Sequence, residues 1–162
     1  MQYRRFEDLP VWRDSAELAR SMYEFTSVDI FRRHPGLRDQ LERAALSVSN
    51  NIAEGFERGT TNELLAFLYI ARGSAGEVRS MMRVLQTWDV FSNCRSQISN
   101  FIVQCEKISK QLYGWIESLK NSEISGQRRL DDKAKNRYAS KKEREQFLEE
   151  LSRISAKPEE KP

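Results

Sequence analysis

The strongest fold signal in the sequence lies at residues 36–57, which are GLRDQLERAALSVSNNIAEGFE. Apolar side chains recur there at steps of three or four residues: Leu37, Leu41, Ala44 and Ala45, Val48, Ile52 and Phe56. That spacing places them on one face of a helix with 3.6 residues per turn. We therefore predict an amphipathic helix over residues 36–57, with Gly59 as the stop signal just beyond it.

An earlier helix is predicted over about residues 9–26. Asp8 is its expected N-cap, and Pro10 falls in the first turn, where the missing N–H of proline costs no helical hydrogen bond. A connector that ends at Pro35 separates this helix from the next one. The inward face is expected to hold Val11, Trp12, Ser15 or Ala16, Ala19, Met22 and Tyr23.

Two more helical patterns follow. One covers about residues 60–88 and begins with Thr60 and Glu63 at the spacing of a capping box. The other covers about residues 92–119 and repeats apolar side chains at helical steps. Four amphipathic helices joined by short connectors pack most simply in alternating directions. The sequence thus predicts an all-α protein, an antiparallel up-down-up-down four-helix bundle over residues 1–119.

The charges of the chain are unevenly distributed. Residues 1–119 hold 15 basic and 15 acidic side chains, whereas residues 120–162 hold 12 basic and 9 acidic ones, so the whole net charge of +3 lies in this C-terminal extension. We expect a charged, partly disordered tail with a short helix near residues 141–155, which is ordered only by packing. The apolar stripe of that helix would be Phe147, Leu148, Leu151 and Ile154.

Neither an enzyme nor a membrane protein is expected. The single histidine, His34, lies in a connector without nearby metal-ligand or general-base partners, and no glycine-rich phosphate loop occurs. The longest apolar run, at residues 64–71, falls far short of the roughly 20 residues that a membrane helix needs. Cys94 and Cys105 are expected to be free, buried or half-buried thiols in a reducing cytoplasm. We predict no catalytic residue, metal or cofactor.

A second, polar stripe runs along the helix at 36–57. Its spacing of 3, 4, 4, 3 and 4 residues puts its members on one face: Gln40, Arg43, Ser47, Asn51, Glu54 and Arg58. A solvated face usually carries Lys and Glu, so Ser and Asn here favour a partly buried polar seam at a subunit interface or around a pore. An ordinary solvated face is the alternative.

Gly73 and Gly76 lie inside the helix at 60–88, where each costs about 1 kcal/mol relative to alanine. A close crossing against a neighbouring helix would offset that cost. Together with Ser74, these glycines predict a small-residue packing patch, either within the bundle or between subunits.

The strings GLRDQLERAALSVSNNIAEGFERG at 36–59 and FLYIARGSAGE at 67–77, preceded by FEDLPVW at 6–12, resemble a known family. This is the family of four-helix-bundle proteins encoded in intervening sequences of bacterial 23S rRNA genes. The resemblance covers about residues 6–119. It implies a pentameric ring, and kinship with the accessory bundle proteins of diversity-generating retroelements, which bind nucleic acid and partner a reverse transcriptase. The positions that carry over are those of the polar stripe, with Gly73, Ser74 and Glu77.

These observations together predict a non-enzymatic homo-oligomer that binds RNA or DNA mainly through phosphates. It would act as an accessory to a reverse transcriptase or another RNA-processing factor. An oligomeric scaffold whose tail docks a protein partner is the alternative. The side chains expected to contact nucleic acid are Arg43, Arg58, Arg79, Arg83, Arg128, Arg129, Lys141 and Lys142.

Overall fold

A computed structural model of the chain describes residues 3–121, 144 and 146–148. The chain divides into two compact units, Met1–Gly126 and Gln127–Pro162. In the second unit, the described residues Arg144 and Gln146 to Leu148 are helical and exposed. The predicted all-α class is confirmed for the described residues, whose long helices are α1 (Pro10–Thr26), α2 (Pro35–Glu57), α3 (Thr61–Thr87) and α4 (Arg95–Lys120).

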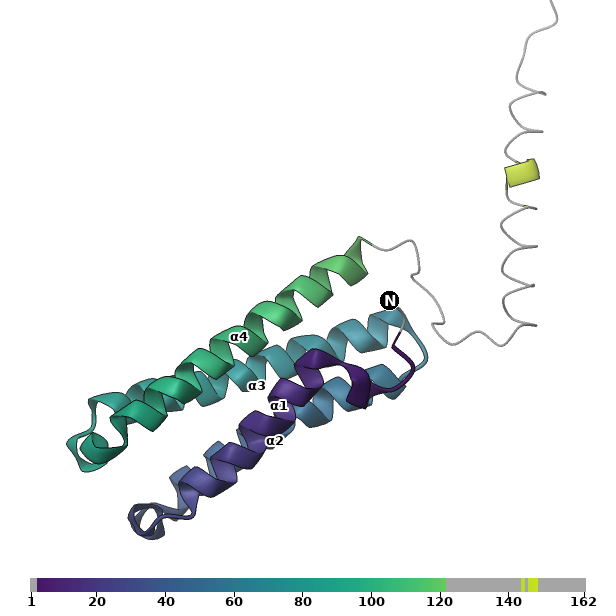
Figure 1. Cartoon of the computed structure of the whole chain (residues 1–162). Coiled ribbons are helices and arrows are strands. Elements are labelled where there is room, and N and C mark those ends of the chain that lie inside the picture. Colours follow the sequence, from purple (N-terminus) through teal and green to yellow (C-terminus); the bar gives the residue numbers. More distant parts are fainter. Residues whose placement is uncertain (1–2, 122–143, 145, 149–162) are drawn as a thin grey trace, which may run out of the picture. The chain divides into compact units, whose positions relative to one another are not determined.

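In the first unit, consecutive helices lie side by side, and the connectors between them fall at alternating ends (Figure 1). Helix α2 packs extensively against both α1 and α3, and α3 packs equally well against α4. The contact between α1 and α4 is much less extensive. The core is therefore closed along three helix pairs and looser along the fourth.

Two helix starts differ from the sequence prediction. Asp8 is not the N-cap of α1: Leu9 occupies that position, and the Asp8 carboxylate instead accepts a hydrogen bond from Arg5 at 3.2 Å. Asp8 belongs to a short 3-10 turn, Phe6–Asp8, that precedes the helix. Helix α4 begins at Arg95 rather than at residue 92, because another 3-10 turn, Asp89–Cys94, occupies the expected first turn.

The junction between α2 and α3 follows the prediction only in part. Thr60 is the N-cap of α3, and its hydroxyl accepts a hydrogen bond from the Glu63 amide at 3.3 Å, as the capping spacing indicated. Gly59 does not provide a left-handed helix end, since no glycine in the described residues has a positive φ. The chain leaves α2 through the extended backbone of Arg58 instead.

Aromatic side chains close the end of the core at the α1–α2 and α3–α4 connectors. Phe31 and Phe91 lie in these connectors and are fully buried. Their ring centroids are 5.3 Å apart, and Phe31 also contacts Phe25 at 5.1 Å. The helical stripe alone did not predict this cluster, which fixes the connectors onto the helix ends.

Two aromatic residues assigned to the inward face of α1 lie nearer its edge. Tyr23 is exposed and Trp12 is half-buried. Both line an apolar surface groove of about 390 Å³ between α1 and α2, together with Leu46 of α2. The buried face of α1 is rotated away from these two residues and towards Leu18 and Phe25, which the predicted stripe did not include. The cysteines are free as expected, Cys105 buried and Cys94 half-buried.

Candidate interaction site between α2 and α3

The polar stripe of α2 forms one wall of a surface groove between α2 and α3. The groove has a volume of about 600 Å³. Five residues singled out from the sequence line it, namely Gln40, Arg43, Ser47 and Asn51 from α2 and Glu77 from α3. We call this surface the α2/α3 groove.

A chain of hydrogen bonds links the two helices at the groove. The Asn51 amide donates to the Ser47 carbonyl at 2.7 Å and to the Ser47 hydroxyl at 2.9 Å. The Ser47 and Ser74 hydroxyls lie 3.0 Å apart, and the Ser74 hydroxyl donates to the Ile70 carbonyl at 3.1 Å. If the Ser47 hydroxyl donates to the Ser74 hydroxyl, both hydroxyls donate one hydrogen bond and accept one. The predicted members Ser47, Asn51 and Ser74 therefore hold α2 against α3.

Arg43 and Glu77 are the charged residues that line the groove, and both are exposed. Neither has an ion-pair partner within the described part of the chain. By contrast, Glu54 and Arg58, which belong to the polar stripe of α2 together with Arg43, form an ion pair with each other at 2.7 Å. The hydrogen bond that Arg58 donates to the Glu54 carboxylate raises the pKa of the Arg58 guanidinium, which also lies over the Phe67 ring at 5.2 Å.

The structure excludes one of the two packing sites predicted for the glycines of α3, the site within the bundle. A Cβ atom added at Gly73 or Gly76 would meet no atom within 4 Å, so neither glycine makes a close crossing with another helix in the described part of the chain. The close crossing lies at Gly55 of α2, where an added Cβ would come within 2.7 Å of the Phe67 Cβ atom. Sequence analysis missed this role, although Gly55 follows Ile52 by three residues and so continues the apolar stripe. Gly73, one turn before Glu77, is exposed and open.

The arginines expected to bind nucleic acid do not all lie on one surface of this chain. Arg79 and Arg83 approach Glu106 of α4 at 4.0 Å and 3.5 Å, on the α3/α4 side. Arg43 lines the groove, and Arg58 lies beyond it at the end of α2. The other four expected contacts lie outside the described residues: Arg128, Arg129, Lys141 and Lys142.

Other classes of site find no support among the described residues. No group of three potential metal ligands occurs there. None of the helices described is both long and apolar enough to span a bilayer. His34 packs against Trp88, with ring centroids 4.9 Å apart, in the aromatic end of the bundle.

Comparison with known proteins places the groove in a family context. Residues 7–114 match the family described as 23S rRNA-intervening sequence protein. The chain belongs to this family. The match covers about two thirds of the chain, including the whole α2/α3 groove, and leaves the charged C-terminal extension outside. No curated protein matches the sequence. The 23S rRNA-intervening sequence family thus accounts for the helical unit but not for the extension.

Proposed function

We propose that this 23S rRNA-intervening sequence family member is a non-enzymatic homo-oligomer, a pentameric ring of antiparallel four-helix bundles, that binds nucleic acid mainly through phosphates. The family description links these proteins to ribosomal RNA genes, which favours RNA as the ligand. A reverse transcriptase or another RNA-processing factor would be its protein partner. The observation that carries the proposal is the α2/α3 groove, with its unpaired Arg43 and Glu77.

The groove supports assembly for two reasons. An exposed cation and an exposed anion line one polar surface without pairing within the described part of the chain, so each is available to the opposite charge on a neighbouring copy. Gly73 adds an open backbone position next to Glu77, where another chain can approach closely. A ring would also bring equivalent arginines of several copies onto one face. Phosphate binding needs such a concentration of positive charge, because the acidic and basic side chains of one helical unit are equal in number.

The ion pairs of the remaining arginines are compatible with phosphate binding. The pairs of Arg58, Arg79 and Arg83 are exposed. Exposed pairs contribute only about 0–1 kcal/mol each, so a phosphate can compete for such arginines. The C-terminal extension adds 12 basic side chains to this inventory. Binding of this kind weakens steeply as salt rises and depends little on sequence.

A charge exchange tests the assembly. Arg43→Glu should lower the mass of the wild-type particle in multi-angle light scattering, because it places two like charges at the interface. Adding Glu77→Arg should restore the mass. Arg32→Glu, at an exposed site outside the groove, is the control for charge alone. A monomeric wild-type protein, or an Arg43→Glu variant of unchanged mass, would contradict the proposed interface.

A second pair of variants separates packing from charge. Gly73→Leu fills the open position next to Glu77 and should block assembly while leaving the helical circular dichroism intact. Gly114→Leu is the matched control, because Gly114 is an equally open, exposed glycine inside α4. Equal particle masses for the two variants would argue against a contact at Gly73.

The contribution of the tail to nucleic-acid binding needs its own variant. Replacing Arg128, Arg129, Lys141 and Lys142 with glutamate should weaken RNA binding and reduce its salt dependence. Fluorescence anisotropy with a labelled mixed-sequence RNA measures both quantities. Unchanged affinity would remove the tail from the mechanism and leave the helical unit as the sole binding surface.

One observation favours a second candidate, an oligomeric scaffold whose tail docks a protein. Phe147 and Leu148 lie in a helical segment with 60% and 54% of their surfaces exposed. Exposed large apolar side chains on a helical segment are typical of a segment that folds onto a partner groove. A gain of helicity on adding the partner would support docking, and Phe147→Ala with Leu151→Ala should abolish it.

A further inference from the structure

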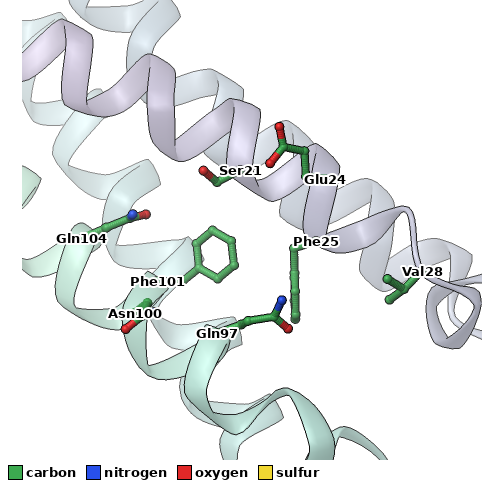
Figure 2. Close-up of a pocket in the computed structure, with 8 residues that line it drawn as sticks. All are labelled: Ser21, Glu24, Phe25, Val28, Gln97, Asn100, Phe101 and Gln104. Carbon is green, nitrogen blue, oxygen red and sulfur yellow. The ribbon is translucent and has the colours of Figure 1, made fainter.

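The loosely packed contact between α1 and α4 contains a cleft of about 290 Å³. Figure 2 shows the Phe101 ring in the middle of this cleft, with the Gln97 and Gln104 side chains on either side and Ser21 on the opposite helix. Asn100 and Glu24 complete the part of the lining that can form hydrogen bonds. The cleft thus combines an aromatic wall with three amides, which recur at steps of 3 and 4 along α4.

The hydrogen-bonding groups of this contact are satisfied unequally along its length. Towards the start of α1, Asp14 accepts hydrogen bonds from Lys107 and from the Gln111 amide, each at 2.8 Å. At the cleft, the Gln104 Oε1 atom is buried and has no hydrogen-bond partner in the described part of the chain. The Gln111 Oε1 atom is also unpartnered, but the Gln111 amide is fixed by Asp14 outside the cleft. A buried acceptor without a donor is unfavourable, so a ligand that donates to Gln104 recovers free energy.

We propose that the cleft between α1 and α4 binds one unpaired nucleobase of single-stranded RNA through its Watson–Crick edge, an inference whose choice of ligand rests on the proposed function. Side-chain amides carry donors and acceptors that match base edges, and proteins combine such groups with aromatic side chains to hold bases out of the stack. The volume lies near the lower end of small-molecule pockets, about 300–1,000 Å³, and so fits one flat ring rather than a larger ligand.

The charge of the lining favours a base over a phosphate. Among the described residues, no Lys or Arg lines the cleft, and the Glu24 carboxylate would repel a phosphate placed inside. The Gln104 Oε1 atom lacks a hydrogen-bond donor, and the amino groups of adenine, cytosine and guanine can supply one. Uracil flanks its single donor with two carbonyl oxygens, which would face the oxygens of Gln104 and Glu24. The cleft should therefore prefer bases that carry an amino group.

Neutral nucleosides are the most direct probe, because they contain the base without any phosphate. Adenosine, cytidine, guanosine and uridine would each be titrated into the ¹⁵N-labelled full chain, following the Gln104 side-chain amide signals. We expect saturable shifts with the first three nucleosides and weaker binding of uridine. Absence of shifts with every nucleoside would overturn the proposal. So would shifts with arginine amide in their place, which would indicate a site for a basic peptide.

Two variants complete the test. Gln104→Leu should weaken the binding of nucleosides and of single-stranded RNA about fivefold each, the loss of roughly one net hydrogen bond, without changing duplex affinity. Gln111→Leu is the control on the same helix and should leave both affinities unchanged. Equal losses for single strands and duplexes, or no loss, would overturn the nucleobase site. A wild-type chain that binds nucleosides but no RNA would instead contradict the proposed function and leave the site standing.

Discussion

The contacts α2/α3 and α1/α4 differ in the size of the side chains that meet there. Between α2 and α3, Gly55 lies against Phe67, and the Ser47 and Ser74 hydroxyls reach each other directly at 3.0 Å. Between α1 and α4, long amides such as Gln97 and Gln104 occupy the corresponding space and line a cleft. Small residues let two helices approach until their polar groups pair. Long polar residues hold helices apart and leave a buried acceptor, the Gln104 Oε1 atom, without a hydrogen-bond donor among the described residues.

Adding a methyl group at Gly55 disrupts the close contact between α2 and α3, and should have the largest effect on the free energy of unfolding. Gly55→Ala places a Cβ atom 2.7 Å from the Phe67 Cβ atom and 3.2 Å from the Leu64 Cδ1 atom. Overpacking of this kind typically costs about 1–3 kcal/mol. Urea denaturation should show a lower midpoint with an unchanged m-value. Gly114→Ala is the control, and should raise stability by about 0.5–1 kcal/mol through helix propensity. Equal stabilisation of both variants would contradict the close contact.

Removing the unpaired Gln104 acceptor tests the other contact, between α1 and α4. Gln104→Leu replaces a buried oxygen without a donor by an apolar group of similar size, and should raise the free energy of unfolding by about 1 kcal/mol. Thermal and urea denaturation in the absence of RNA measure this change. A decrease of similar size would show that the amide is satisfied in the folded protein. Gain of stability with loss of binding is typical of a functional site.

Acid should weaken the paired end of the α1/α4 contact. Burial acts to raise the pKa of Asp14, but hydrogen bonds from Lys107 and Gln111 outweigh it, so the pKa lies below its usual 3.8. A carboxyl group whose pKa is lowered in the folded state contributes its full stabilisation above the unfolded-state pKa. This contribution is lost as the pH falls through the folded-state pKa. We expect Asp14→Asn to reduce the loss of stability between pH 6 and pH 3 by less than about 1 kcal/mol. Identical losses in both proteins would contradict this pairing.

Periodicity was sufficient to predict the helices and the faces that form the α2/α3 groove. Gln40, Arg43, Ser47 and Asn51 share a face because the helical repeat is a local property. Periodicity did not place Glu77 of α3 beside them; the family resemblance did, and Glu77 lines the same groove. Which members remain unpaired is not local. Arg58 and Glu54 pair one turn apart, whereas Arg43 has no ion-pair partner among the described residues, although Asp39 lies one turn before it in the sequence.

The features that sequence analysis missed depend on contacts between distant segments. Phe31 and Phe91 lie in connectors, outside any helical stripe, and are buried only because two connectors meet at one end of the bundle. Gly55 and Gly73 both lie inside helices, and only the packing of α2 on α3 distinguishes the crowded one from the open one. The amides of α4 were visible in the sequence, but the separation of α1 from α4 was not.

Nucleic-acid binding is the central claim, and fluorescence anisotropy across a salt series tests it most directly. The full chain would be titrated against labelled mixed-sequence single-stranded RNA and against duplex DNA. We predict binding that weakens steeply with salt, with a slope of log affinity against log salt that reports the number of phosphates neutralised. Absence of binding to either ligand at low salt would contradict the account and leave the protein-docking scaffold as the better description.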